Sequence, residues 1–310
     1  MKRSLIVVTW NGLQFLPRCL QSLQQQLTSD DEILVIDNAS TDGSAEFVAE
    51  RFPDVRLARL PCNLGYAGGV NHGLHLARGD RFFIFNQDLE LCTGWLSYMS
   101  AALQEPSVGI VGCKILYPDG RLQHAGGSIR WPQALPNHYG HLQEDDGRWD
   151  QIREVDYVTG AAWGFSTALV HRIGMLDASF WPGYFEEVDF CFRASDAGFR
   201  VCYIPEAIAI HAESTTLTQG SEQYLRAFHQ NRLRFALKRL SPQRFVEEFT
   251  PAELTWLEDL CPLEQHILGS VYKISMLMAG SIYAPNAVWE DVQDVIHNLY
   301  ILWERARVLL

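Results

Sequence analysis

The chain has 310 residues, of which 47% are hydrophobic and 20% charged, and this ordinary composition excludes a largely disordered protein. Its 25 basic and 37 acidic residues give a net charge of −12, which argues against a general nucleic-acid-binding protein. A small phosphate ligand stays possible, because local groups or a metal can neutralise it. The seven cysteines are scattered and form no CxxC pair, so we expect a reduced, cytoplasmic protein.

Two apolar stretches could be mistaken for membrane segments. The run in MKRSLIVVTW is short and is broken by Asn11 and Gly12, so it predicts a first strand rather than a signal peptide. The stretch 267–288 contains Lys273 and Pro285 as well as small polar residues. It therefore predicts a buried helix rather than a span.

Short apolar runs alternate with helical patterns along the first 117 residues. Candidate strands are rich in Val, Ile and Phe and cover 4–10, 32–38, 55–60, 81–86 and 108–116. Apolar residues recur at helical spacing over 13–27, 43–52 and 66–78. This alternation predicts right-handed βαβ units and an α/β fold with a mostly parallel sheet covered on both faces.

Polar residues follow three of these candidate strands directly. They are Thr9-Trp10-Asn11, Asp37-Asn38 and Asn86-Gln87-Asp88. Ligands of open parallel sheets bind beyond the carboxyl ends of the strands. Although one such cluster would be ordinary turn chemistry, three together favour a binding site at this edge.

The rest of the chain changes character several times. Residues 119–150 are rich in Gly, Pro, His and Trp and predict a hairpin and a long loop, and regular patterns return from 155 to 212. Residues 221–244 form a basic helical segment with six basic residues and one acid, net +5, whereas 251–310 carry eight acids and three bases, net −5. We place a domain boundary near 220, which gives a domain 1–220 and a helical region 221–310.

Two roles fit the basic segment 221–244. It could rest on an anionic membrane surface, or it could pack as an ordinary helix with its arginines paired to the acidic tail. Because the net charges of the two segments cancel, we favour packing. The C-terminal helices could also cover the core, form a homodimer or receive a substrate.

The segment YFEEVDFCFRASDAG, 184–198, places Glu186, Glu187 and Asp189 at the start of a predicted helix. Acids are favourable there because they oppose the positive end of the helix dipole. Three like charges within four positions should also raise the proton affinity of at least one of them. The segment is therefore either a helix start or a site that takes a proton or holds a cation.

In this order the motifs resemble the family 2 inverting glycosyltransferases of the GT-A fold, particularly the bacterial rhamnosyltransferase-like branch. The resemblance runs from Ser4 to about Leu240 and rests on five motifs: VVTWNG, VIDNASTDGS at 35–44, NLGYAGGVNHG at 63–73, FNQDLEL at 85–91, and FEEVDFCFRASDAGFRVCYIPEAIAIH at 185–211. It implies a GT-A catalytic domain, a nucleotide-diphospho-sugar transferase with a Rossmann-like sheet, over 1–220, followed by a C-terminal helical extension.

The resemblance implies donor-binding roles for residues of the first half. Thr9 and Asp37 match positions that contact the base and ribose, and a carboxylate can accept the imide N–H of uracil or thymine. Asn11 belongs to the same motif as Thr9. Asn63 and Gly65 begin a loop whose glycines allow close packing and can present backbone N–H groups.

FNQDLEL corresponds to the family's DxD segment, which binds the ribose and a divalent cation. Here the first position is Asn86, so the metal would depend on Asp88. Mg2+ or Mn2+ needs few protein ligands when phosphate oxygens and water complete the coordination. His211 matches a late metal ligand of related enzymes, although a lone His after a strand is also compatible with a structural role.

In the family the acidic segment reads E-D-x-D, and its second acid is the catalytic base. That position is Glu187 here, one methylene longer. Glu186 and Asp189 would support it or contact the acceptor, and Arg193 lies one helical turn beyond Asp189. Three residues resemble the small-residue loop that faces the acceptor, Gly160, Ala161 and Ala162, and Trp163 lies nearby.

The expected activity is transfer of a sugar from dTDP-rhamnose or a UDP-sugar to a glycan or lipid-linked acceptor in cell-surface polysaccharide synthesis. Two alternatives stay open. A metal-dependent nucleotidyltransferase would carry a basic glycine-rich loop near the N-terminus, and NGLQFLPR lacks that character. A non-catalytic sugar-nucleotide or glycan-binding module is suggested by Asn86 and Glu187, which replace family aspartates.

Overall fold

The structure is a computed structural model that describes residues 2–212, 220–283, 285 and 287–309. The chain divides into two compact units. The first comprises Met1–Ser128, Asn137–Pro182 and Glu186–Thr216, and the second comprises Ile129–Pro136, Gly183–Phe185 and Leu217–Leu310. The second unit thus takes in two short segments that precede residue 220 in the sequence. Within the described residues, no helix has both the length and the apolar character that a bilayer span requires.

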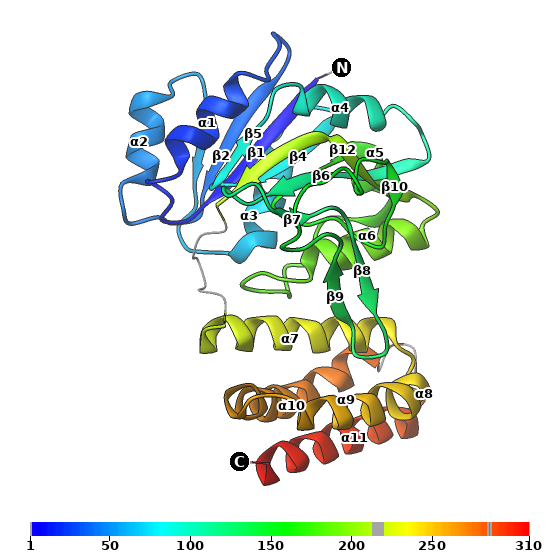
Figure 1. The fold of residues 1–310 in the computed structure, drawn as a ribbon. Helices are drawn as coiled ribbons and strands as arrows, with labels where there is room; N and C mark the ends of the chain where they lie inside the picture. Colours follow the sequence, from blue (N-terminus) through cyan, green and yellow to red (C-terminus); the bar gives the residue numbers. More distant parts are fainter. Residues whose placement is uncertain (1, 213–219, 284, 286, 310) are drawn as a thin grey trace. The chain divides into compact units, whose positions relative to one another are not determined.

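A large mixed sheet forms the centre of the first unit (Figure 1). Its strand order is β10-β12-β6-β11-β4-β1-β2-β3. The strands β4, β1, β2 and β3 are neighbours and run parallel. These strands are close to the predicted ranges: β1 Arg3–Thr9, β2 Glu32–Asp37, β3 Arg56–Arg59, β4 Arg81–Asn86, and, further along the sheet, β6 Val108–Leu116. The predicted α/β fold with a mostly parallel sheet is confirmed.

Later parts of the chain complete the sheet. β11 (Ala162–Ser166) lies antiparallel between β4 and β6, and β12 (Arg200–His211) runs parallel to β6 on its other side. Three short strands add to this sheet: β5 Leu89–Leu91 and β10 Arg153–Glu154 pair with β12, and β7 Leu122–His124 pairs with β6. β8 Gly127–Arg130 and β9 Leu135–His138 form a separate two-stranded sheet. The strand that separates β4 from β6 therefore comes from far along the sequence.

Helices cover both faces of the sheet because successive strand residues point to opposite sides. Leu5 and Val7 belong to one core with α1 (Leu16–Gln24), α2 (Ser44–Arg51) and α4 (Trp95–Ala102). On the other face lie α3 (Gly65–Leu76), α5 (Thr167–Ile173) and α6 (Glu186–Asp196), as Figure 1 shows. There Phe190 of α6 packs on Trp163 of β11, with ring centroids 5.6 Å apart.

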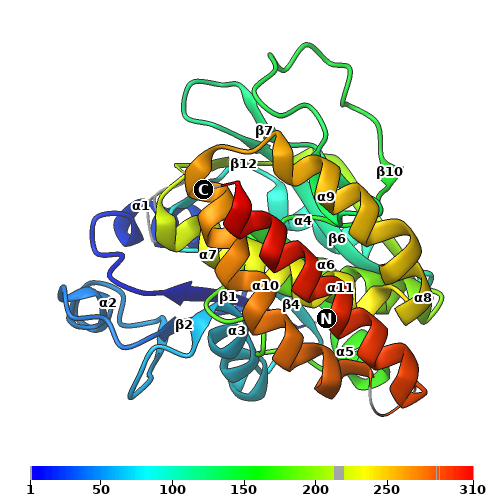
Figure 2. The same ribbon diagram turned by 90° about the horizontal axis from the view of Figure 1, so that it is seen from below.

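The second unit is helical (Figure 2). Its main elements are α7 Glu222–Arg239, α8 Pro242–Arg244, the π-helix η1 Phe245–Phe249, α9 Thr250–Glu258, α10 Pro262–Tyr283 and α11 Trp289–Val308. Arg232 of α7 forms a fully buried ion pair with Glu253 of α9. Tyr272 of α10 donates a 2.8 Å hydrogen bond to the same carboxylate. These contacts agree with the expectation that the basic segment packs against the acidic tail.

Candidate active site

Three adjacent parallel strands bring the predicted donor residues to one edge of the sheet. Thr9 of β1 is paired in register with Asp37 of β2, and Val8 is paired with Asn86 of β4. Thr9 and Asp37 are both buried, whereas the side chain of Asn86 is half-buried. The carboxyl ends of the strands therefore meet where an open parallel sheet binds its ligands.

Gln87 holds the end of β1 in place. Its Oε1 accepts a 2.6 Å hydrogen bond from the Thr9 hydroxyl and a 2.9 Å bond from the Trp10 backbone N–H. A Cβ atom on Gly12 would lie 2.2 Å from the same Oε1. The side chain of Gln87 thus fixes the path of the loop that follows β1. It also holds the candidate residue Thr9, the last residue of that strand.

Asn11 joins the loops that follow β1 and β2. It has a positive φ of 50°, which Asn tolerates better than most residues. Its backbone N–H donates to the Ser40 hydroxyl at 2.9 Å, and its Oδ1 accepts from the Thr41 N–H at 2.8 Å. Between these loops lies a groove of about 590 Å³ lined by Asn11, Leu13, Gln14, Thr41 and Asp42. The groove lies at the same edge as Thr9 and Asp37.

Asp37 has a buried carboxylate oxygen at this edge that can still accept a hydrogen bond. Its Oδ2 accepts a 3.4 Å hydrogen bond from the Ser40 N–H, whereas Oδ1 is buried and has no hydrogen-bond partner among the residues that the structure describes. A buried acceptor of this kind costs free energy unless a ligand satisfies it. This oxygen can accept a hydrogen bond from a ligand group such as an imide N–H or a ribose hydroxyl.

Asn38 and Asn63 set the start of α3. Asn38 accepts a hydrogen bond from the Leu64 N–H at 2.8 Å and donates to the carbonyl of Gly65 at 3.0 Å. The Oδ1 atom of Asn63 accepts from the N–H of Gly65 at 2.8 Å. Gly65 has a φ of +73°, and a Cβ there would lie 2.8 Å from the carbonyl oxygen of Pro182. This position therefore needs glycine for both conformation and space.

Asp88 and His211 come together although 123 positions separate them. Asp88 follows β4, His211 ends β12, and Oδ1 of the aspartate is 3.2 Å from Nε2 of the imidazole. Both side chains are buried, each residue being 8% exposed. Nδ1 of His211 is 2.7 Å from Oε1 of Gln123. The structure thus brings together the two residues that the sequence predicts as metal ligands.

The pair fits a hard divalent cation. Carboxylate and imidazole are suitable ligands, and two adjacent ligands at about 2.1 Å in octahedral geometry lie about 3.0 Å apart. Within the described ranges, no cluster of three or more His, Cys, Asp or Glu side chains could hold a metal. A cation held by Asp88 and His211 would therefore depend on ligands from outside the protein, such as phosphate oxygens.

The three acids of the predicted helix start occupy the first turn of α6. A sharp turn precedes them, because Tyr184 and Phe185 both have positive φ, 76° and 71°. Glu186 is buried, and its Oε2 has no hydrogen-bond partner in the described part of the chain. Burial, followed by the neighbouring Glu187 carboxylate, raises the pKa of Glu186 well above its usual range. Glu187 is more exposed than Glu186.

Asp189 is placed inside the protein. It is 1% exposed, and its Oδ2 accepts a 2.7 Å hydrogen bond from Nε of Arg193. The same guanidinium donates to the carbonyls of Ile173 and Met175 at 2.8 and 2.9 Å. Asp189 thus orients the expected neighbour, Arg193, and Arg193 fastens α6 to the end of α5 and the residues that follow it.

Tyr66 connects the acidic helix to the small-residue loop. Its hydroxyl donates to the carbonyl of Gly160 and accepts a 3.0 Å hydrogen bond from the indole N–H of Trp163. Burial, followed by the charges of Glu186 and Glu187, raises the pKa of Tyr66 well above its usual range. Trp163 is fully buried, so its ring supports the site from within.

The small-residue loop also touches the donor edge. The backbone N–H of Asn86 donates to the carbonyl of Ala161 at 2.9 Å, and Ala162 is paired with Phe85 in the sheet. The loop 160–162 is therefore bonded both to the end of β4 and to Tyr66, and Tyr66 bonds to Trp163, on which Phe190 of α6 packs.

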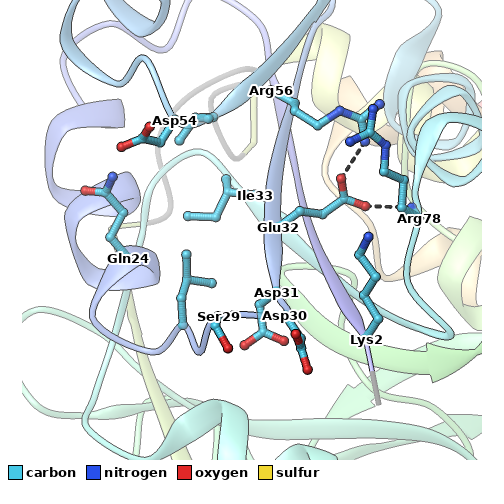
Figure 3. Close-up of a pocket in the computed structure, with 12 residues that line it drawn as sticks. Lys2, Gln24, Ser29, Asp30, Asp31, Glu32, Ile33, Asp54, Arg56 and Arg78 are labelled. Atoms are coloured by element: carbon cyan, nitrogen blue, oxygen red, sulfur yellow. Dashed lines mark hydrogen bonds and ion pairs between the residues drawn. The ribbon is translucent and has the colours of Figure 1, made fainter.

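A second cavity lies at the opposite edge of the sheet. Figure 3 shows this groove of about 520 Å³, where Glu32 at the start of β2 bonds to Arg56 and to the backbone N–H of Arg78. Asp31 is paired with Arg3. Because the amino ends of the strands line this groove and its best-buried carboxylates are already paired, we do not assign the sugar-nucleotide site to it.

Four residues with clear structural roles in this site had no role assigned from the sequence: Asn38, Tyr66, Gln87 and Gln123. Asn38, Tyr66 and Gln87 stand inside the motifs at or after the ends of β2, β3 and β4, so their position in these motifs could have indicated a role in the site. Gln123 stands in a region whose pattern predicts only a hairpin and a loop. Its contact with His211 joins positions 88 apart, and no local pattern carries that information.

The sequence matches the profile described as Glycosyl transferase family 2 over residues 4–172, more than half of the chain. The chain belongs to this family. A relative named N-acetylglucosaminyl-diphospho-decaprenol L-rhamnosyltransferase, from Mycobacterium tuberculosis, is 26% identical over 262 residues, which is 76% of this chain and 84% of the relative. The uncharacterized protein y4gI of Sinorhizobium fredii is 31% identical over 228 residues, 69% of this chain. The matched part is only 24% of that relative's own length.

The fold of this family 2 member is that of GT-A glycosyltransferases. A mannosyltransferase of Pyrobaculum calidifontis, solved in complex with GDP-Man and Mn2+, aligns with a TM-score of 0.57 at 17% identity. The alignment covers 99% of this chain and 86% of the mannosyltransferase. At this identity the likeness concerns the fold alone.

Proposed function

We propose that this family 2 member is an inverting hexosyltransferase, which moves a sugar from a nucleotide-diphosphate donor to a glycan or lipid-linked acceptor. One observation carries the proposal. The helix α6, which carries Glu187 in its first turn, packs through Phe190 on Trp163, and the Trp163 indole bonds to Tyr66. Tyr66 in turn bonds to Gly160 of the loop 160–162, which bonds to Asn86 at the end of β4. Donor-binding groups and a base are thus present in one connected site.

Glu187 acts as the general base. The acceptor hydroxyl forms a bond to the anomeric carbon while the bond from that carbon to the diphosphate oxygen breaks, and the hydroxyl proton passes to the Glu187 carboxylate. Attack opposite the leaving group inverts the anomeric configuration. Burial, followed by the neighbouring Glu187 carboxylate, raises the pKa of Glu186 and so favours its neutral form, which suits a supporting residue.

The donor is bound at the strand ends. Asp37 and Thr9 contact the base and ribose, Asn11 shapes the groove between the first two loops, and Asn63 and Gly65 set the start of α3. Asn86 supplies an amide where related enzymes have a carboxylate. Asp88 and His211 would hold Mg2+ or Mn2+, which neutralises the diphosphate when bound. Gly160, Ala161, Trp163, Glu186 and Asp189 shape the acceptor side.

For the donor we propose dTDP-rhamnose or a UDP-sugar. The name of the Mycobacterium tuberculosis relative contains both an L-rhamnosyl group and a diphospho-decaprenol acceptor, which supports a rhamnosyl donor and a lipid-linked acceptor. Such an acceptor would place the protein at the cytoplasmic side of a membrane. Leu277 of α10 and Tyr300 of α11 are exposed apolar residues through which the helical unit could meet a membrane or a second copy.

A non-catalytic sugar-nucleotide-binding module is the second candidate, because Asn86 and Glu187 replace acids that the family prefers. The test is nucleotide release from dTDP- and UDP-sugars with Mg2+ or Mn2+, measured for the wild type, Glu187→Gln and Glu90→Gln. Glu90 is a matched control because it lies near Asp88 and forms a partly exposed ion pair with Arg18.

We expect metal-dependent release that falls at least tenfold in Glu187→Gln, about 1.4 kcal/mol of barrier, and is unchanged in Glu90→Gln. Donor affinity should be similar in all three proteins. Tight donor binding without release, with or without a glycan or lipid-linked acceptor, would support the binding module instead.

A further inference from the structure

His211 makes different contacts through its two ring nitrogens. Nδ1 lies 2.7 Å from the amide oxygen of Gln123, and Nε2 lies 3.2 Å from Oδ1 of Asp88. The three residues are almost closed to solvent, with exposed fractions of 7% for Gln123 and 8% for the other two. Inside such a site each polar atom needs a definite partner.

The contact with Gln123 determines which nitrogen of the neutral ring carries the proton. An amide oxygen only accepts hydrogen bonds, so Nδ1 must be the donor. The neutral ring then has an unshared electron pair on Nε2, directed toward the carboxylate of Asp88. In this tautomer Nε2 can bind a cation that the Asp88 carboxylate binds as well. This is the arrangement that metal-binding imidazoles have when the other ring nitrogen donates to an oxygen.

We propose that Gln123 is a positioning residue that fixes the ring orientation and tautomer of His211 for cation binding. This inference rests on the proposed function, because it assumes that Asp88 and His211 hold the metal. Gln123 would not touch the metal, the donor or the acceptor. Its effect would pass entirely through the imidazole of His211.

The surroundings hold Gln123 in place. It lies on β7, whose flanking residues Leu122 and His124 pair with Leu116 and Ile115 of β6. Its own carbonyl is 3.3 Å from Nδ1 of His141. Because the backbone is fixed on both sides, the amide oxygen can keep the imidazole in one orientation without a large entropic cost at the moment of binding.

His124 strengthens the same strand. Its Nε2 accepts a 3.2 Å hydrogen bond from the Thr159 N–H, and its Nδ1 is 2.8 Å from Nδ1 of His138. Thr159 directly precedes the loop 160–162. The strand that carries Gln123 is therefore attached to the acceptor-side loop as well as to the metal-binding pair.

The test measures Mn2+ affinity of the full chain, by electron paramagnetic resonance of free Mn2+, with UDP or dTDP present and no sugar donor. The variants are Gln123→Leu, which removes the oxygen that accepts a hydrogen bond from His211, and Gln123→Glu, which keeps an oxygen at that position. Gln133→Leu is the matched control, because Gln133 belongs to the second unit, where its side chain bonds to the Ala252 carbonyl of the same unit. Asp88→Asn reports loss of the metal site itself.

We expect a 10- to 100-fold weaker affinity in Gln123→Leu, typical for loss of an outer partner of a metal ligand. Gln123→Glu should bind as well as the wild type or better, and Gln133→Leu should be unchanged. Equal affinity of Gln123→Leu and the wild type, with Asp88→Asn impaired, overturns the inference alone. No Mn2+ binding by the wild type overturns both the metal site and the inference.

The tautomer of the metal-loaded protein supplies a second readout. In protein with ¹⁵N-labelled histidine, saturated with Mg2+ and UDP and with His211 assigned from a His211→Gln variant, the ring of His211 should carry its proton on Nδ1. In Gln123→Leu under the same conditions, part of the protein should carry the proton on Nε2, where Asp88 can accept it. A wild-type ring protonated on Nε2 contradicts the inference. If Gln123→Leu does not fold, this result and the affinity of Gln123→Glu decide the question.

Discussion

Glu186 and Glu187 are the same residue type, adjacent in sequence, in two environments. Glu186 is buried, whereas Glu187 is more exposed. Burial disfavours a carboxylate, and a like charge beside it disfavours it further. The pKa of Glu186 is therefore raised, which favours its neutral form and suits a supporting residue rather than the base.

Glu186 should make stability fall as pH rises. Its pKa is raised in the folded protein, so the folded state binds more protons than the unfolded state above the ordinary glutamate pKa of about 4.3. The stability that Glu186 contributes is present below that pH and is lost as pH rises toward the folded pKa. Glu186→Gln removes this dependence, so its melting temperature relative to wild type should rise from pH 4.5 to 8. A difference that is constant with pH would contradict the raised pKa.

Tyr66 offers a prediction about the link between the acidic helix and the loop. Tyr66→Phe removes the hydroxyl that bonds to the Gly160 carbonyl and the buried Trp163 indole. Leaving these groups unsatisfied should lower the free energy of unfolding by about 1–3 kcal/mol, measured by urea denaturation. Tyr98→Phe, at a residue 46% exposed, is the control and should change it by less than about 0.5 kcal/mol. Equal effects of the two changes would exclude a special role for the Tyr66 hydroxyl.

At the scale of elements, glycine lets α3 approach the sheet closely. A Cβ on Gly69 would lie 2.6 Å from Cγ1 of Val8, and a Cβ on Gly73 would lie 2.6 Å from Cγ2 of Ile6. The sequence shows these glycines within a helical pattern, where they weaken the helix. Their packing role appears only when β1 is placed beneath them.

Gly69→Ala should therefore destabilise the protein although alanine is the better helix former. Overpacking costs about 1–3 kcal/mol, and helix propensity returns about 1 kcal/mol, so we expect a net loss of up to about 2 kcal/mol in chemical denaturation. In a Val8→Ala background, the same change should be much less harmful. Gly280→Ala in α10, where a Cβ meets nothing within 4 Å, should stabilise instead. If Gly69→Ala lowers the free energy of unfolding equally in the wild-type and Val8→Ala backgrounds, the close contact with Val8 is not the cause.

The local elements of the sheet were largely predictable. The candidate strands 81–86 and 108–116 coincide with β4 and β6, since short runs rich in Phe, Ile and Val have the length and composition of buried strands. The predicted helix 13–27 is shorter in the structure, where α1 covers Leu16–Gln24 with a proline in its first turn. The insertion of β11 between β4 and β6 was not predictable, because it depends on pairing between distant segments.

At the scale of the whole molecule, the helical unit contains its own buried ion pair. Arg232 and Glu253 are both 0% exposed, and the Arg232 guanidinium also donates to the carbonyl of Gln133 at 2.7 Å. Residues 129–136 therefore belong to this unit although they lie far from it in sequence. A fully buried pair is costly to break on one side only, because the remaining charge has no compensation.

Arg232→Met should lower the free energy of unfolding by about 3–5 kcal/mol, since it leaves Glu253 buried as a single charge. Combining it with Glu253→Leu should recover most of that loss in calorimetric unfolding. Arg226→Met, which breaks the more exposed pair with Glu222, should cost no more than about 0.5 kcal/mol. If the double variant were as unstable as the single one, the uncompensated charge would not be the cause.

The sequence by itself determined the α/β class, the order of its early elements, the family resemblance and the type of residue at each candidate site position. These are local properties, fixed by periodicity and by motifs of a few residues. Only the tertiary structure decided which of these side chains meet. It brought Asp88, Gln123 and His211 together, buried Trp163 and Asp189, and gave Glu186 and Glu187 different surroundings. Contact and burial depend on strand pairing across more than a hundred positions, which no short pattern encodes.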